Sequence, residues 1–138
     1  ASGSTAAGKA EASRIGLLVD MGHVPLMEET FEFALQHAAP YIGHVHLGSC
    51  VMRDPNDPLY GDMHPPWGYP GGENDVPELV HFLHGLFAAG YLGEGRRPTV
   101  TLEMRPYPGL SEAASVAVFL EKLAEAWSQV ASERGLPS

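Results

Sequence analysis

The stretch Leu17-Leu18-Val19-Asp20-Met21-Gly22-His23 is a short apolar run that ends in a carboxylate and an imidazole. Two later segments repeat the arrangement, because His44-Val45-His46 and Val100-Thr101-Leu102-Glu103 also join apolar residues to a histidine or an acid. Apolar runs without polar alternation are typical of parallel strands buried on both faces. In parallel α/β folds, the chemistry lies at the carboxyl ends of such strands. The three segments therefore predict a parallel sheet whose polar residues meet at one edge.

Strands and helices are expected to alternate along the chain. The expected strands cover residues 15–21, 41–47 and 98–103, and a helix follows each of them. Alternation of this kind implies parallel strands joined by crossover helices. The predicted fold class is therefore α/β, made of three successive parallel βα units. Three strands cannot close an eight-unit barrel, which needs roughly 200 residues or more. The fold is therefore either a small open sheet or part of a barrel whose remainder lies elsewhere.

Local signals predict where the helices begin. Pro25 is expected to open the first helix, because its fixed φ and missing N–H suit a first turn. Asp75 is expected to cap the second helix, with Glu78 three residues later completing a capping box. Ser111 is expected to cap the third helix, on which Trp127 is a predicted core residue.

Composition restricts the class of protein. The 138 residues, 44% of them hydrophobic, are enough for one domain with a real core. We expect a linker or pre-strand segment over residues 1–14 and one domain over residues 15–138. The net charge of −9 disfavours a broad nucleic-acid surface. A single cysteine, no apolar run long enough to cross a bilayer and no secretory pattern together predict a cytoplasmic protein without a membrane partner.

A long loop rich in proline and glycine covers residues 48–74. Loops of this length in a compact domain are functional or disordered. The aromatic and histidine content favours an ordered loop that faces a ligand. Trp67 is expected either to stack on a sugar or to pin the loop to the domain.

The candidate site residues are carboxylates and imidazoles that follow the strands or lie in this loop: Asp20, His23, His46, Asp62, His64 and Glu103. Oxygen and nitrogen donors together suit divalent zinc, manganese, cobalt or iron. Structural alternatives stay open at this point. Asp20 can close an Asx-turn, His46 can be a satisfied core histidine, and Arg105 can pair with Glu103 or bind an anion. His44 is expected to support His46 or to belong to the core.

From Ile15 to about Pro106 the chain resembles the C-terminal part of the xylose-isomerase-like TIM-barrel superfamily, which includes sugar isomerases, ketose 3-epimerases and the endonuclease IV family. The motifs that carry the resemblance are Asp20-Met21-Gly22-His23, His44-Val45-His46 and Leu102-Glu103-Met104-Arg105-Pro106. The resemblance implies the last three strands of such a barrel. It also implies Asp20, His46 and Glu103 as metal ligands, and His23 as a substrate contact and catalytic residue. The superfamily's other metal-binding glutamate has no counterpart here.

The resemblance implies an isomerase or epimerase that acts on a sugar or sugar phosphate. A divalent ion (manganese, zinc, cobalt or magnesium) would polarise the substrate, and Glu103 would move a proton through a metal-stabilised enediolate. The expected substrate contacts are His23, His64, Trp67 and Arg105.

Two alternatives accompany this expectation. Asp62-Met63-His64 resembles an Asp-x-His element of endonuclease IV, where the pair would hold further zinc in a phosphodiesterase. A shortage of lysine and arginine, 8 in total, disfavours nucleic acid as the partner. The other alternative is a non-catalytic fragment. Because the edges of a three-strand sheet are open to pairing, we expect a homo-oligomer or a complementary chain.

Overall fold

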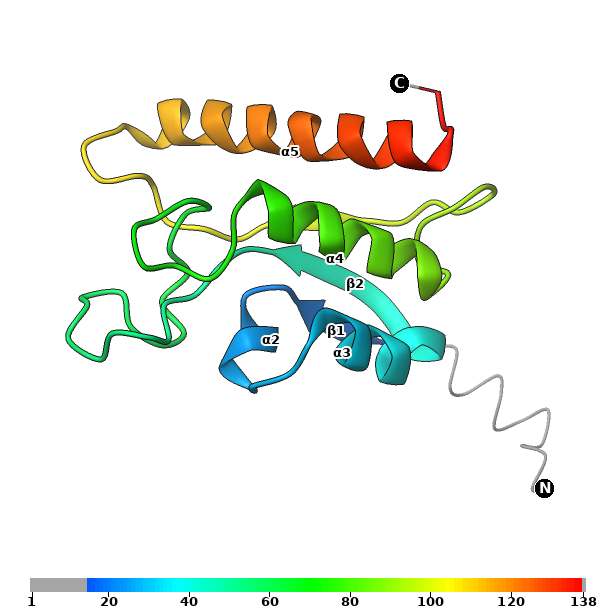
Figure 1. Cartoon of the computed structure of the whole chain (residues 1–138), viewed down its shortest axis with the longest axis horizontal. Helices are drawn as coiled ribbons and strands as arrows, with labels where there is room; N and C mark the ends of the chain where they lie inside the picture. The colour runs from blue at the N-terminus through cyan, green and yellow to red at the C-terminus, as the bar shows by residue number, and fades with distance from the viewer. Residues whose placement is uncertain (1–14, 138) are drawn as a thin grey trace.

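The computed structural model describes residues 15–137 and contains one parallel sheet with helices between its strands (Figure 1). The strands are β1 (Leu17–Asp20), β2 (Ile42–Leu47) and β3 (Val100–Leu102). The helices are α2 (His23–Leu26), α3 (Phe31–Ala38), the 3-10 turn η1 (Ala39–Tyr41), α4 (Val76–Ala88) and α5 (Glu112–Arg134). The expected linker at residues 1–14 lies outside the described residues.

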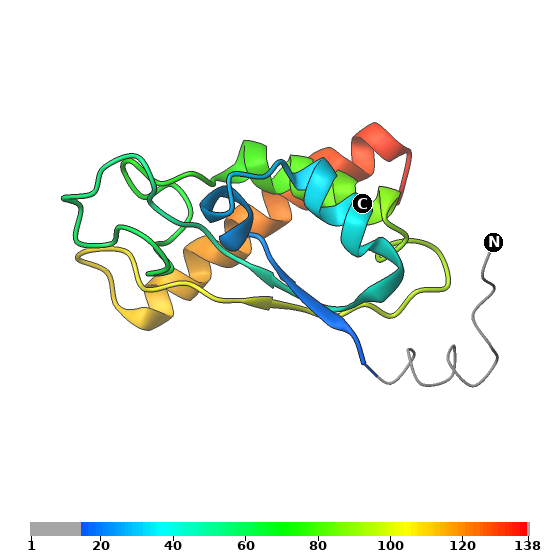
Figure 2. The ribbon, with the colours of Figure 1, turned by 90° about the horizontal axis from the view of Figure 1, so that it is seen from below.

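The sheet has the order β1-β2-β3 and is parallel throughout, which confirms the predicted α/β fold class. Helices α3 and α4 lie on one face of the sheet, and α5 packs against α4 (Figure 2). On this covered face, Val19, Val45 and Leu47 are buried because their side chains alternate with those on the other face. The core therefore lies between the sheet and its helices.

The other face of the sheet is not covered by any described helix. His44 and Thr101 lie on it, and Leu18, which pairs with His44 in the register, is 52% exposed. The prediction of a first strand buried on both faces, over residues 15–21, is therefore wrong. The helices of all three βα units lie on the same side, which leaves the other face of the sheet open.

The first helical region begins earlier than predicted and is interrupted. Pro25 lies inside the short helix α2, which starts at His23, and does not open a long helix. The chain then turns at Glu28, whose φ is +57°. Helix α3 starts at Phe31 because the Thr30 hydroxyl accepts the N–H of Phe33 at 3.1 Å.

Two of the other helix predictions fail, and one is confirmed. Asp75 precedes α4, but its side chain makes no cap hydrogen bond and is paired with Lys122 Nζ at 2.6 Å. Ser111 caps α5 as predicted, accepting the N–H of Ala114. Trp127 is 37% exposed and stacks on Phe87 at the surface between α4 and α5, so it is not a core residue.

The loop between β2 and α4 is held to the domain by its own side chains. Trp67 is fully buried, its indole N–H donates to the Gly48 carbonyl at 3.2 Å, and its ring meets Phe119 edge-on. The Tyr107 hydroxyl donates to the Trp67 carbonyl at 2.5 Å. Of the two roles considered for Trp67, the structure has the one that pins the loop.

Within residues 15–137, no helix has both the length and the apolar character needed to cross a membrane.

Candidate metal centre

The three strands deliver one functional residue each to the same end of the open face. Asp20 is the last residue of β1 and pairs in register with His46 of β2. Glu103 follows β3 directly, and its N–H continues the ladder to the Leu47 carbonyl at 3.0 Å. Because the strands are parallel, their carboxyl ends lie side by side, as the sequence predicted.

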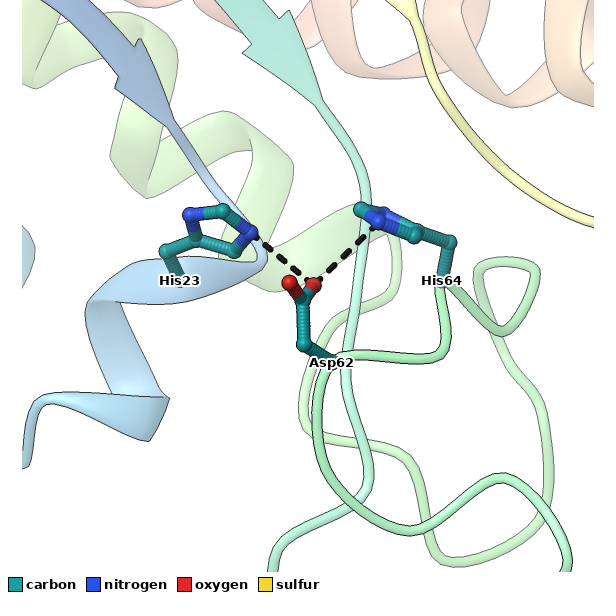
Figure 3. A group of neighbouring side chains, drawn as sticks. All are labelled: His23, Asp62 and His64. Atoms are coloured by element: carbon teal, nitrogen blue, oxygen red, sulfur yellow. Dashed lines mark hydrogen bonds and ion pairs between the residues drawn. The ribbon is translucent and has the colours of Figure 1, made fainter.

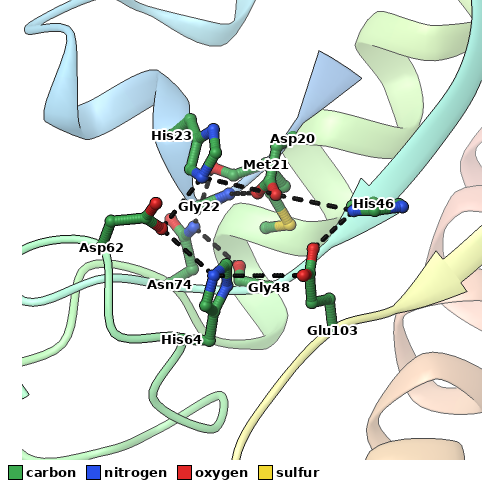
Figure 4. Close-up of polar contacts among 10 residues, drawn as sticks. All are labelled: Asp20, Met21, Gly22, His23, His46, Gly48, Asp62, His64, Asn74 and Glu103. Atoms are coloured by element: carbon green, nitrogen blue, oxygen red, sulfur yellow. Dashed lines mark hydrogen bonds and ion pairs between the residues drawn. The ribbon is translucent and has the colours of Figure 1, made fainter. Parts of the chain in front are cut away.

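The remaining candidates come from the segments that follow these strands. His23 begins α2, and the loop after β2 carries Asp62 and His64 back to the strand ends. Together the six residues form a closed ring in which carboxylates and imidazoles alternate (Figure 4): Asp20, His23, Asp62, His64, Glu103 and His46. We refer to this arrangement as the acid–histidine ring.

The ring is closed by six nitrogen-to-oxygen distances, none longer than 4.0 Å. Asp20 lies 3.6 Å from His23 and 3.8 Å from His46. Asp62 lies between two imidazoles, 2.9 Å from His23 and 3.2 Å from His64 (Figure 3). Glu103 accepts from His46 Nδ1 at 2.5 Å and lies 4.0 Å from His64 Nε2. Each carboxylate therefore has an imidazole on either side.

The carboxylate of Asp20 is oriented by the backbone beneath it. Its side chain is 5% exposed, and Oδ1 accepts the N–H of Gly22 at 2.8 Å. A side chain at position 22 would collide with the Ser49 carbonyl, since an added Cβ would lie 2.8 Å from that oxygen. Glycine at this position lets the Ser49 carbonyl approach the turn closely, and Oδ2 of Asp20 faces His23 and His46. The Asx-turn considered for Asp20 is therefore present, and it leaves one carboxylate oxygen for the site.

Two sets of three side chains within the ring offer ligand atoms that all lie within 4.8 Å of one another. One set is His23, Asp62 and His64, and the other is Asp20, His64 and Glu103. His64 belongs to both, whereas the family resemblance implies His46 as the ligand beside Asp20 and Glu103. In the structure His46 reaches that set through its hydrogen bond to Glu103.

The charges of the ring are not balanced by lysine or arginine. Within residues 15–137, the carboxylates of Asp20, Asp62 and Glu103 have only histidines as ion-pair partners, whereas Arg53 pairs with Glu73. Three acids grouped in this way repel one another unless a cation or protons neutralise them. Carboxylate oxygens and imidazole nitrogens at these separations fit a divalent cation.

Asn74 supports the site and was missed by the sequence reasoning. It is 2% exposed, and its Nδ2 donates to the carbonyls of Met21 and Gly48, at 3.3 and 3.0 Å. It thereby joins the ends of β1 and β2. Its Oδ1 is buried without a hydrogen-bond partner among the described residues. The only sequence signal was a polar residue just before a helix, which is also typical of a cap.

Trp67, Arg105 and His44 make other contacts than those expected from the sequence. Trp67 is fully buried, which leaves it no surface for a sugar and corrects that expectation. Arg105 does not pair with Glu103, and its Nε donates to the Met63 carbonyl at 2.7 Å. His44 hydrogen-bonds the hydroxyls of Thr99 and Thr101, both at 2.9 Å, and is not in the buried core.

Cys50 lies near the ring without joining it. Burial raises the pKa of its thiol to about 12, and the nearby carboxylates of Glu73, Asp62 and Asp20 act in the same direction. The buried thiol is therefore protonated at physiological pH, and Cys50 belongs to neither ligand set. The ring, rather than the cysteine, is the candidate metal centre.

Comparison of the chain with protein-family models and with curated proteins found no match in either case.

Proposed function

We propose that this chain carries the metal centre of a divalent-metal-dependent isomerase or epimerase that acts on a sugar or sugar phosphate. The observation that carries the proposal is the acid–histidine ring at the carboxyl ends of three parallel strands. Asp20, His64 and Glu103 would hold the ion, with His46 hydrogen-bonded to Glu103. The ion would polarise the carbonyl and the adjacent hydroxyl of an open-chain sugar.

Glu103 is the proposed base. Its Oε2 is hydrogen-bonded to His46, while Oε1 faces His64 at a longer distance of 4.0 Å. The side chain is 41% exposed toward the open face, so a substrate there can reach it. From this position Glu103 would take the proton from the carbon next to the carbonyl. His23, 47% exposed on the far side of Asp20, is the proposed substrate contact.

Exchange of a ketose proton with solvent tests this assignment. Exchange needs only one base, so it reports on Glu103 even if the second acid/base of a full isomerisation comes from a completing chain. The protein, loaded with manganese, zinc or cobalt, would be incubated in D2O with ketopentoses, ketohexoses and their phosphates, and deuterium uptake would be followed by NMR. We expect uptake in the wild type, none in Glu103→Gln, and normal uptake in the control Glu78→Gln in the first turn of α4. Normal uptake in Glu103→Gln would refute the role of this residue.

A zinc-dependent phosphodiesterase of the endonuclease IV type is the second candidate. The observation that favours it is the set His23, Asp62 and His64, which lies beside the first set and shares His64 with it (Figure 4). Because His64 Nε2 can ligate only one ion, His23 and Asp62 would hold a second ion beside the first, and adjacent ions of this kind are used in phosphate-ester hydrolysis. Elemental analysis separates the candidates. About one ion per chain supports the isomerase, and two or three support the phosphodiesterase.

We also propose that the open face is completed by a further chain, either a second copy or a complementary one. Leu17 and Leu18 of β1, at the edge of the sheet, and Ile15 just before this strand are all more than 45% exposed. Exposed apolar strands of this kind favour pairing with another chain. Light scattering tests the proposal, and a monodisperse monomer would count against it. We also propose a cytoplasmic location, which the free thiol of Cys50 supports.

A further inference from the structure

His64, the residue that both candidate metal sets share, has an unusual backbone conformation. Its φ is +53°, and Glu28 is the only other non-glycine residue with a positive φ among residues 15–137. Side chains with a Cβ are disfavoured in this region. Pro65 follows directly, and a residue before proline favours a φ near −120°. Some contact must therefore hold His64 in this conformation.

Arg105 supplies two hydrogen bonds at this point. Its backbone N–H donates to the His64 carbonyl at 2.8 Å, and its side-chain Nε donates to the Met63 carbonyl at 2.7 Å. One residue thus engages two successive carbonyls of the strained segment. We call this pair of bonds the Arg105 bridge. Because Arg105 is two residues beyond Glu103, the bridge fastens the loop to the strand end that carries Glu103.

The charge of Arg105 has no evident partner in the centre. Among the described residues, no carboxylate lies within 4.0 Å of its guanidinium group. A positive charge beside a cation site lowers affinity for the cation, so charge alone would not favour arginine here. The hydrogen bond from Nε to the Met63 carbonyl is the side-chain contact that Arg105 makes with the described residues.

We propose that Arg105 is a positioning residue for the metal centre. The Arg105 bridge holds His64 in the left-handed conformation, in which its Nε2 faces Asp62 at 3.2 Å and Glu103 at 4.0 Å (Figure 4). Without the side-chain bond, the segment from Met63 to Pro65 would relax, and His64 would leave one or both ligand sets. The inference rests on the proposed metal-dependent function.

Two substitutions separate the hydrogen bond from the charge. In Arg105→Gln, the amide nitrogen lies the same number of bonds from Cα as Nε does, so a donor remains and the charge is lost. In Arg105→Met, the terminal methyl occupies that place, so both donor and charge are lost. We expect Arg105→Met to bind Co²⁺ about tenfold more weakly, the loss typical when a support of a metal ligand is removed. Arg105→Gln keeps the donor and loses the charge, so it is expected to bind Co²⁺ at least as tightly as the wild type.

The measurement is a Co²⁺ titration followed by visible absorption, with melting by circular dichroism as a check on folding. Arg97→Met, which removes a positive charge on the loop before β3, is the control and should leave Co²⁺ affinity unchanged. If Arg105→Met does not fold at 25 °C, Arg105→Leu replaces it, because leucine also lacks a donor and a charge, and the same weakening of Co²⁺ binding is expected.

The outcomes separate a failure of the role proposed for Arg105 from a failure of the proposed metal centre. Weaker binding in Arg105→Met, restored in Arg105→Gln, supports the bridge. Equal affinities in the two variants would overturn it, while Co²⁺ binding by the wild type would leave the proposed metal centre standing. A wild-type protein that binds no Co²⁺, Mn²⁺ or Zn²⁺ would overturn both.

Discussion

Neutralising Asp20 should make the metal-free protein more stable and remove its response to metal. Asp20 and Glu103 offer oxygen atoms within 4.8 Å of each other. Two unit charges at that distance repel by about 3.5 kcal/mol at an effective dielectric constant of about 20. Since Glu103 is 41% exposed and water screens it, we expect a relief of about 1–2 kcal/mol in Asp20→Asn. The asparagine Oδ1 can still accept the Gly22 N–H, so the turn is kept.

The assay is thermal unfolding in EDTA and then in increasing Zn²⁺, Mn²⁺ or Co²⁺. In EDTA the variant should melt about 3–8 °C higher than the wild type. A ligand at a hundred times its Kd stabilises the folded state by about 2.7 kcal/mol. The melting temperature of the wild type should therefore rise with added metal, while that of Asp20→Asn should rise little.

A matched control is Asp75→Asn, which removes a carboxylate paired with Lys122. This variant should lose up to about 1 kcal/mol and keep the metal response of the wild type. The reasoning is refuted if Asp20→Asn melts lower than the wild type in EDTA, or if metal stabilises both proteins equally.

Three further predictions follow from buried groups. Trp67→Phe should lower the free energy of unfolding by about 1–3 kcal/mol in urea titrations, because the variant loses packing and the hydrogen bond to the Gly48 carbonyl. An unchanged urea midpoint would contradict the core position of Trp67. Burial raises the pKa of Tyr107 to about 12, above an unfolded value near 10, so its stabilising contribution should be complete below pH 10 and disappear as pH rises through 12. Tyr107→Phe should remove that alkaline loss in unfolding curves measured from pH 9 to 12. Cys50, with a pKa of about 12 and 1% exposure, should react with a thiol reagent at pH 8 only after unfolding, and rapid labelling of the folded protein would contradict its burial.

Local patterns were sufficient where a feature depends on neighbouring residues. The apolar runs before Asp20, His46 and Glu103 predicted three parallel strands, and the structure confirms them. The cap at Ser111 could be predicted because its hydroxyl bonds an N–H only three residues later in the chain, that of Ala114. The same reasoning failed at Asp75, since Lys122 of a distant helix competes for its carboxylate. It also failed for Leu18, whose burial depends on whether any element covers that face.

By itself, the sequence determined the fold class and which residue types end the strands, because strand alternation and apolar periodicity are properties of adjacent residues. Only the tertiary structure decided how the six acids and imidazoles meet, since the loop brings Asp62 and His64 to strands far from them in the chain. It also brought His64 within ligand distance of Asp20 and Glu103, and it placed Trp67 in the core. It also showed that the Arg105 side chain donates a hydrogen bond to the Met63 carbonyl and does not pair with Glu103. These outcomes depend on distances across the fold, which no local pattern contains.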